Sequence, residues 1–172
     1  MQRAANICGF RRFSMANKRG SPDFKEGWQK HHLLPRQLFS RRCLDSMLTS
    51  IGSAGVWLDD FDGNGVLLPG NEAVAFEERL PLHRGPHRIC NELVFERVGA
   101  VEMEWSRIRS RNELQAKDAA IGRIRLVQRG LARRLDGEGA APIVLNRRDP
   151  IGHGVDYSNL DAMADMLWGA TR

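Results

Sequence analysis

Long apolar runs and paired cysteines are both missing from this chain of 172 residues, and each absence excludes a class of protein. No run approaches the roughly 20 uncharged apolar residues that cross a bilayer, so we expect neither a membrane protein nor a membrane partner. The three cysteines, Cys8, Cys43 and Cys90, are widely spaced and form no Cys-x-x-Cys pair. The sequence therefore indicates neither a disulfide framework nor a zinc ribbon.

The N-terminus lacks acidic residues before Asp23, and it also lacks the apolar stretch of a secretory signal. Residues 1–26 instead contain several arginines and lysines, with Gly20-Ser21-Pro22 as loop punctuation. The composition is compatible with an amphipathic transit peptide, but we expect a flexible basic arm.

Lysine and arginine outnumber acidic residues, 26 to 21, which gives a net charge of +5 and a sequence pI of about 9.6. The charge is divided along the chain, since residues 1–58 and 105–148 are basic whereas residues 59–104 and 149–172 are acidic. A basic balance makes a polyanion a plausible partner without naming one. Apolar residues make up 42% of the chain and charged residues 27%, so a globular protein with a buried core is expected.

Apolar periodicity and turn residues predict a mainly helical chain with two short strands. Apolar residues at three- and four-residue steps predict a helix over 36–51, ended by Gly52, and a longer one over 114–135. Asn71 suits the N-cap of a short helix that reaches residue 79, and Pro86 suits the first turn of a helix that runs past residue 98. We expect strands at 28–34 and 66–69, a small helix at 159–168, and either a strand or a loop at 56–58.

Four of the five histidines form two tight groups, and this clustering is the strongest chemical signal in the sequence. His31 and His32 are adjacent on an expected strand, where the twist near the strand end would let both rings reach one cleft. His83 and His87 are four residues apart, so on a helix or at its start both rings project to the same side. Two such rings and one further imidazole give three nitrogen ligands for a divalent metal, and they leave a position open for water or substrate, as in catalytic sites.

Other interpretations compete with this catalytic site. A closed structural zinc needs a fourth ligand, which Cys90, three residues after His87, could supply. A single histidine is more often a satisfied polar residue at a helix end or on the surface, and we assign His153 to that class. The aspartates within 59–62 suggest a calcium loop, but no closing Glu follows at the required spacing, so they are interpreted as turn residues.

Three motifs in order resemble a known nuclease family. They are Trp-Gln-Lys-His-His-Leu-Leu-Pro at 28–35, Asn-Gly-Val-Leu-Leu-Pro at 64–69 and Leu-His-Arg-Gly-Pro-His at 82–87. Together they resemble the AHH branch of the HNH/endonuclease VII superfamily, a group of ββα-metal nucleases often found as toxin domains. The resemblance covers about residues 28–98. Lys30 stands where the family's name expects Ala, and the long gap before His83 suggests an insertion that carries residues 71–79.

The resemblance implies an α+β fold, in which a ββα-metal, HNH-like core of a short antiparallel hairpin and a helix is embedded in a mainly helical domain. Two strands are not stable by themselves, so the helices are expected to supply most of the buried area. We expect three parts in chain order: a flexible basic N-terminal arm at 1–26, the ββα-metal nuclease core at 27–104, and a helical C-terminal extension, basic then acidic, at 105–172.

The resemblance also implies a metal-dependent endonuclease that hydrolyses phosphodiester bonds with one divalent ion, Zn, Mg, Mn or Ni. DNA is expected in preference to RNA. Because no recognition helix is evident, we expect low sequence specificity and binding that weakens as salt rises. A bacterial toxin or effector with an acidic immunity protein as partner is a further expectation, so the compartment is either the cytoplasm or that of a delivered effector.

Two alternatives to this function stay open. The first is a non-catalytic nucleic-acid-binding module whose histidines hold a structural zinc. The second is a site-specific HNH nuclease of restriction or mobile-element type.

By resemblance, the clustered histidines divide into one general base and three metal ligands. His32 would be the base, because a neutral imidazole with a pKa near ~6.5 accepts a proton at physiological pH. Asn64 would bond to backbone through its side-chain amide and so hold the base in register. An alternative pairs His87 with Asn91 as ligands and leaves His83 to contact phosphate or the transition state. The preferred metal ligands are His31, His83 and His87.

Arginines near these residues are candidates for binding substrate. Arg84 and Arg88 lie beside the expected ligands, where their guanidinium groups would bind the phosphates that flank the scissile bond. Arginines further away would either extend a positive track or form solvated helix faces; these are Arg36, Arg41, Arg42, Arg123, Arg125, Arg129, Arg133 and Arg134.

Overall fold

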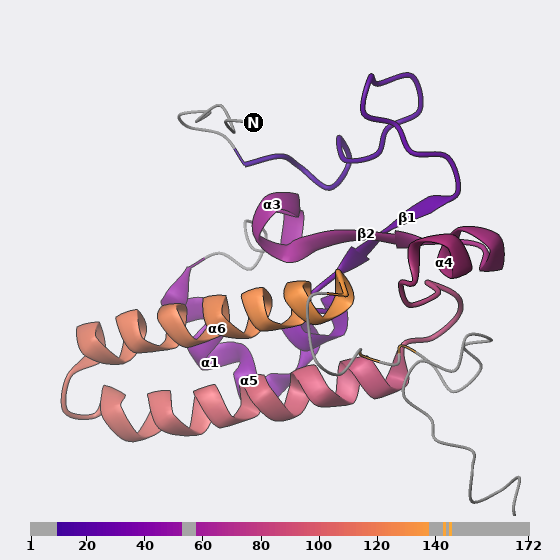
Figure 1. The fold of residues 1–172 in the computed structure, drawn as a ribbon. Coiled ribbons are helices and arrows are strands. Elements are labelled where there is room, and N and C mark those ends of the chain that lie inside the picture. Colours follow the sequence, from indigo (N-terminus) through magenta and orange to yellow (C-terminus); the bar gives the residue numbers. More distant parts are fainter. Residues whose placement is uncertain (1–9, 53–57, 138–142, 144, 146–172) are drawn as a thin grey trace, which may run out of the picture.

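A computed structural model describes residues 10–52 and 58–137, together with Ile143 and Leu145. It consists of a two-stranded antiparallel hairpin and a set of helices, of which two long ones run side by side beneath the hairpin (Figure 1). The expected α+β fold, a short hairpin in a mainly helical domain, is confirmed. Residues 56–57, His153 and the small helix expected at 159–168 lie outside the described residues.

The hairpin pairs β1 (Trp28–His32) with β2 (Gly65–Pro69), and its register runs from Trp28 opposite Pro69 to His32 opposite Gly65. Both strands lie where the sequence predicts them, but β1 ends at His32 rather than at residue 34. The chain then leaves the sheet, and Pro35, with a φ of −66° and a ψ of 146°, is the N-cap of a 3-10 helix that begins at the next residue.

The prediction of a single helix over 36–51 is wrong in one respect, because the structure has two helices there. η1 (Arg36–Ser40) is a 3-10 helix and α1 (Arg42–Ile51) is an α-helix, while Arg41 between them is extended, with a φ of −82° and a ψ of 111°. The Arg41 guanidinium lies 4.5 Å from the centre of the Phe95 ring. The break between the two helices thus coincides with a contact to a distant part of the chain. Apolar periodicity, which reports only local structure, does not predict such a break.

Two short helices flank β2. α3 (Phe61–Asn64) is a single turn in which the Asp60 side chain accepts a hydrogen bond from the Gly63 backbone N–H at 2.9 Å, where the sequence predicts only turn residues. α4 (Glu72–Glu78) follows the predicted N-cap, Asn71, and confirms the predicted short helix, whereas its being an insertion stays a prediction.

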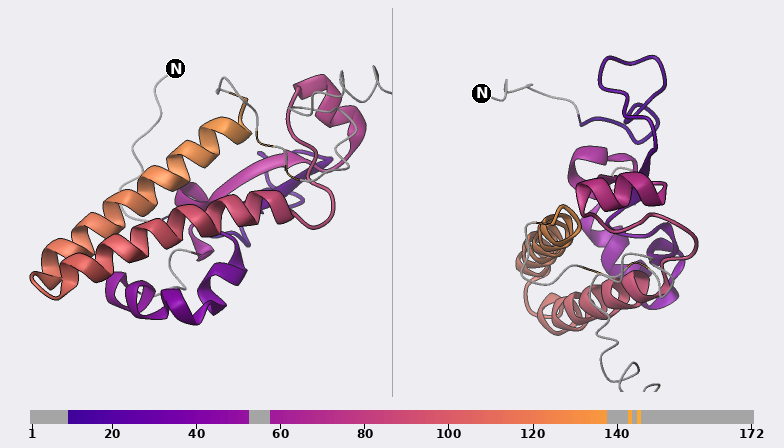
Figure 2. Two further views of the ribbon diagram at one scale, coloured as in Figure 1. Left: turned by 90° about the horizontal axis from the view of Figure 1, so that it is seen from below. Right: turned by 45° about the vertical axis from the view of Figure 1, so that its right-hand side comes forward.

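The long helices are α5 (Arg88–Arg109) and α6 (Glu113–Leu135), and both confirm the sequence prediction. They pack against each other and diverge away from the turn that joins them, and α1 packs against both (Figure 2). α5 begins two residues after Pro86, with His87 as its N-cap, and it passes through Gly99 without a break. Among the described helices, none combines the length and the apolar character that a membrane span requires.

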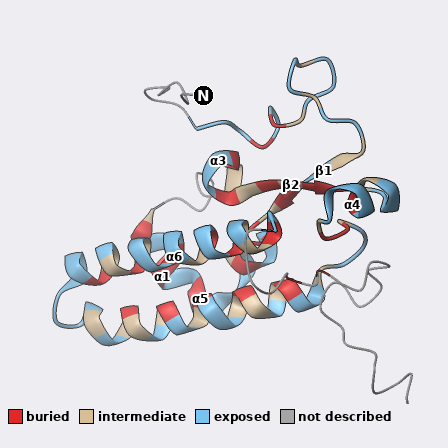
Figure 3. Ribbon diagram, in the orientation of Figure 1, coloured by how far each residue is buried: buried red, intermediate tan, exposed pale blue. Residues whose placement is uncertain are grey.

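The main core lies where α1, α5 and α6 meet one face of the hairpin, and buried positions line the inner sides of these helices (Figure 3). Val94 on α5 and Ile124 on α6 both belong to this core. The sequence suggests that the nuclease core ends at residue 104. In the structure this residue lies within α5, which continues to Arg109 without a break. The division into parts at 1–26, 27–104 and 105–172 stays a prediction.

The two faces of the hairpin have different neighbours, because side chains alternate along a strand. The face turned to the main core, here called the helix face, contains Gln29, His31, Leu33, Val66 and Leu68. The opposite face, here called the outer face, contains Lys30, His32 and Leu67.

Residues 10–26 cover the outer face without forming a helix or a strand of their own. Phe13 is only 9% exposed, Ala16 is fully buried, and both pack with Phe61 in a second small core. The Phe13 backbone N–H donates to the Asp59 carbonyl at 3.0 Å. The described part of the N-terminal segment is thus attached to α3 and to the strand beside it.

Candidate metal centre

Three imidazoles converge at one end of the hairpin, and they come from three different elements. His31 lies on β1, His83 lies in the segment between α4 and α5, and His87 is the N-cap of α5. One potential ligand nitrogen of each ring lies within 4.8 Å of the others. The ring centres are 5.1 Å apart for His31 and His83, 5.0 Å for His31 and His87, and 4.5 Å for His83 and His87. The structure therefore brings together the three residues that the sequence suggests as metal ligands.

Backbone contacts hold the two ring-bearing segments beside the sheet. The His83 N–H donates to the Pro69 carbonyl at 2.7 Å, which ties this segment to the end of β2. Gly85, between the two histidines, has a φ of 73°, a conformation that glycine adopts without steric cost. The chain can therefore turn between His83 and His87 and present both rings to His31.

Two buried nitrogen atoms of this cluster have no hydrogen-bond partner, and this fits a metal site. Among the described residues, three buried side-chain nitrogens are in this condition: His31 Nε2, His87 Nδ1 and the Trp105 indole nitrogen. Burying a polar atom without a partner is costly, and a divalent cation would use both imidazole lone pairs. The donor set, three imidazole nitrogens with no further His, Cys, Asp or Glu ligand among the described residues, fits a cation that keeps an open coordination position.

Gln29 orients the third ring of the cluster, a role that the sequence analysis missed. Its Oε1 lies 2.8 Å from His83 Nδ1, and an amide oxygen only accepts hydrogen bonds, so Nδ1 carries the proton. His83 Nε2 is then left with its lone pair. A partner that fixes the tautomer of a ligating histidine is typical of metal sites. Gln29 lies two residues before His31 on the same face of β1, which is the signal that could have found it.

The histidines of the cluster are neutral at physiological pH. Burial, and after it the neighbouring rings of His83 and His87, lowers the pKa of His31 to about 3. Burial and then His87 lower the pKa of His83 to about 4, and burial lowers the pKa of His87. A neutral ring keeps the lone pair that a metal ligand needs.

His32 lies outside this cluster, on the outer face. Its ring stacks on the Phe13 ring with the centres 3.7 Å apart and the planes within 2° of parallel, and Phe13 meets Phe61 edge to face at 5.1 Å. Burial and then the charge of Arg36 lower the pKa of His32, whereas a hydrogen bond to the Leu58 backbone acts in the opposite direction. The ring is therefore neutral and held in place. Phe13 has no motif around it, and the sequence analysis missed it.

Asn64 is fully buried and joins the two strands where β1 ends. Its Oδ1 accepts a hydrogen bond from the Leu34 N–H at 2.8 Å, and its Nδ2 donates to the Leu34 carbonyl at 3.4 Å. Its backbone carbonyl accepts from the Leu33 N–H at 2.9 Å. These are the amide-to-backbone contacts expected of Asn64 from the resemblance.

The remaining candidate residues lie around the cluster. Arg84 is exposed and forms an ion pair with Glu72 at 3.0 Å, and Arg88 is exposed on the first turn of α5. The Asn91 side chain donates to Gln37 Oε1 at 3.1 Å. This contact uses the Asn91 NH₂ group and leaves its Oδ1 available, so the choice between His83 and Asn91 as a ligand stays a prediction.

Cys90 does not complete a four-ligand zinc site in this arrangement. It is 2% exposed and belongs to the main core, outside the group of three histidines. The arrangement favours an open, catalytic type of site over a closed structural one.

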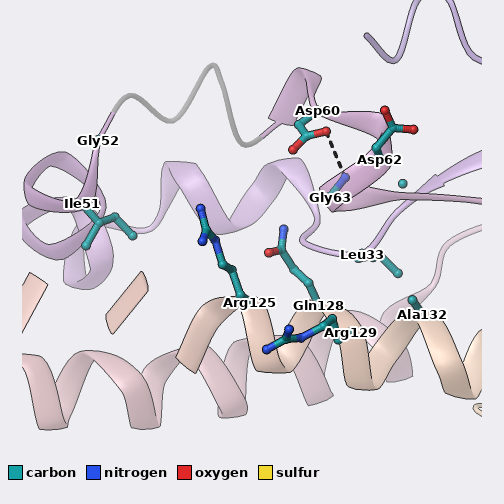
Figure 4. Close-up of a pocket in the computed structure, with 11 residues that line it drawn as sticks. Leu33, Ile51, Gly52, Asp60, Asp62, Gly63, Arg125, Gln128, Arg129 and Ala132 are labelled. Carbon is teal, nitrogen blue, oxygen red and sulfur yellow. Dashed lines mark hydrogen bonds between the residues drawn. The ribbon is translucent and has the colours of Figure 1, made fainter. Parts of the chain in front are cut away.

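A separate pocket of about 600 Å³ lies between α6, the end of α1 and α3 (Figure 4). Arg125, Gln128 and Arg129 line it from α6, and Asp60 and Asp62 line it from the side of α3. Neither the three histidines of the cluster nor His32 lines this pocket, so it is distinct from the candidate metal centre.

Comparison with known proteins gives a family. Residues 13–131, more than half of the chain, match the family described as AHH, a nuclease family of the HNH/ENDO VII superfamily with conserved AHH. The match begins at Phe13 and reaches well into α6, so it extends beyond the residues that carry the resemblance. Neither the curated proteins nor the solved structures gave a match.

Proposed function

Because this chain belongs to the AHH family of nucleases, within the HNH/ENDO VII superfamily, we propose that it is a metal-dependent endonuclease that hydrolyses phosphodiester bonds in DNA with little sequence preference. The observation that carries the metal dependence is the convergence of His31, His83 and His87, with two buried nitrogens that have no other partner. HNH/ENDO VII nucleases usually use a divalent metal.

The proposed mechanism divides the work between the two faces of the hairpin. The helix face would hold the cation with His31, His83 and His87, and the cation would neutralise charge that develops on the phosphate. On the outer face, neutral His32 would take a proton from the attacking water. β1 pairs with β2 alone among the described strands, so no strand covers its other edge, and we expect the scissile phosphate to lie across that edge, between the two faces.

Two further groups support this arrangement. Asn64 bonds to the backbone that directly follows β1, which would keep His32 in register. Arg88 is exposed one residue after His87, and Arg84 one residue after His83, where each would bind a flanking phosphate. Contacts of this kind recognise the backbone rather than bases, so binding should weaken as salt rises.

The decisive experiment compares plasmid nicking by the parent and by His32→Ala in Mg²⁺, Mn²⁺, Ni²⁺ and Zn²⁺. We expect nicking by the parent and a loss of about 100-fold or more in His32→Ala, since removal of a general base costs that much. The metal content of His32→Ala should equal that of the parent. The same assays with single-stranded RNA as substrate decide whether the protein cleaves DNA or RNA.

Other outcomes would favour the alternatives. A parent that binds metal and DNA but cuts nothing would favour a binding module with a structural zinc. Discrete bands in place of a smear would favour a site-specific nuclease. The toxin role and its acidic immunity partner stay predictions, tested by whether expression of the parent kills the host while His32→Ala is tolerated.

A further inference from the structure

We propose that Gln128 of α6 is a positioning residue of the nuclease site, which acts through Asn64 on the end of β1. The inference rests on the proposed function, because it assigns a role within that site. It adds a part of the chain that lies outside the three motifs and 64 residues from Asn64 along the sequence.

The contact that carries the inference is a buried hydrogen bond between two side-chain amides. Gln128 is 5% exposed, and its Nε2 donates to Asn64 Oδ1 at 3.2 Å. The same oxygen accepts the Leu34 N–H at 2.8 Å. An amide oxygen has two lone pairs, so both acceptor positions of Asn64 Oδ1 are filled.

The Gln128 NH₂ group, as the second donor to Asn64 Oδ1, helps to fix the orientation of the Asn64 amide. Rotation by half a turn would place the Asn64 NH₂ group against two donors, the Leu34 N–H and the Gln128 NH₂ group. Without Gln128, only the contacts with Leu34 would oppose that rotation. Because Leu33 and Leu34 directly follow the adjacent histidines, the orientation of this one amide bears on how firmly the end of β1 is held.

Gln128 also stands out on its own helix. The other buried residues of α6 are apolar, and an apolar side chain would satisfy the pattern at position 128. A buried polar group that breaks the local pattern is expected at functional sites. Figure 4 shows the Gln128 side chain projecting from α6 toward the segment that carries Gly63, with Arg125 and Arg129 on either side along the helix.

The test replaces Gln128 with Met, which keeps the length of the side chain and the helix propensity but removes the donor. The control is Gln115→Met, the same chemical change at an exposed position of α6. A second control, Ile124→Val, weakens packing at a buried α6 position that has no contact with Asn64 through a polar group.

Two measurements are made on each variant. The first is kcat and KM for plasmid nicking by the folded protein, and the second is hydrogen exchange of the Leu34 amide without metal. We expect Gln128→Met to lower kcat about tenfold or more with KM nearly unchanged, because small misplacements of reacting groups are costly. It should also increase Leu34 exchange about tenfold relative to the amides of α5, whereas both controls should leave these two quantities near the parent's.

Each result decides the matter. Unchanged Leu34 exchange would overturn the proposal, whatever happens to kcat, because the postulated route runs through that bond. Faster Leu34 exchange with an unchanged kcat would overturn the positioning role. If the parent cuts nothing, the proposed function is wrong, and the exchange measurement still decides whether Gln128 holds Asn64 and the end of β1.

Discussion

The helix face and the outer face of the hairpin hold adjacent histidines in different surroundings. His31 is 4% exposed among other imidazoles and has an unpartnered nitrogen, whereas His32 is half-buried against a phenyl ring and has a backbone partner. Alternation along a strand accounts for the difference, since consecutive side chains point in opposite directions. One dipeptide can thus supply two chemically different imidazoles, one suited to a cation and the other to a proton.

Of the variants that test the difference between the two faces, His31→Ala should have the largest effect, and that effect is on metal affinity. Removal of one of three nitrogen ligands should lower the metal affinity by at least about 100-fold, more than the loss of an outer partner of a ligand costs. His32→Ala should leave the metal affinity near the parent's. Calorimetric titration with Zn²⁺ or Ni²⁺ measures both, and equal losses in the two variants would show that the two faces do not divide the chemistry.

The outer face is tested by Phe13→Ala, which removes a nearly buried ring. We expect the free energy of unfolding to fall by about 3–5 kcal/mol, as for other buried phenylalanines, and kcat to fall because His32 loses its stacking partner. The metal affinity should not change. Urea unfolding and nicking assays measure these quantities, and Phe13→Leu serves as the control that keeps much of the packing without the ring stack.

Gln29→Leu tests the role of the helix face in metal binding, because Gln29 Oε1 fixes the tautomer of His83. Loss of this acceptor should weaken metal binding about 10-fold, in the range found for partners of ligating histidines. Gln29→Glu is the matched control, since its carboxylate also accepts from Nδ1. A similar loss in both variants would contradict the assigned tautomer.

The smallest effect is expected from Cys90 at alkaline pH. Burial raises the pKa of its thiol from 9.0 to about 11 in the folded chain, so the folded state keeps the proton that the unfolded state releases. The protonated thiol therefore stabilises the fold fully below about pH 9, and this contribution is lost as the pH rises towards 11. The free energy of unfolding should fall by about 1 kcal/mol between pH 8 and pH 9.5. Urea unfolding of the parent and Cys90→Ala measures this, and parallel pH profiles for the two would contradict it.

The sequence was sufficient for the elements whose signal is local. The long helix α6 follows from apolar periodicity, and α4 follows from its N-cap at Asn71. The histidine triad could be predicted because its members are of one rare residue type at short spacings. The break at Arg41 could not, since the contact there is made with Phe95 on another helix.

The parts of the site that sequence reasoning missed share one property. Gln29, Phe13 and Gln128 each act on a neighbour rather than at the reacting atoms, and two of them make their contact across a long stretch of chain. Amides and phenyl rings are common in any sequence, so their types carry no chemical signal. These contacts are revealed only by the way α6, residues 10–26 and the segment that carries His83 pack against the hairpin.

The stack of His32 on Phe13, with Phe61 behind it, has a consequence for anyone who redesigns or compares such chains. A Cβ added at Gly65, opposite His32, would collide with the Phe61 ring. A methyl group there would displace the Phe61 ring, which packs edge to face on Phe13, and so would shift the ring on which His32 stacks. Related sequences that replace this glycine should show a smaller side chain where Phe61 stands.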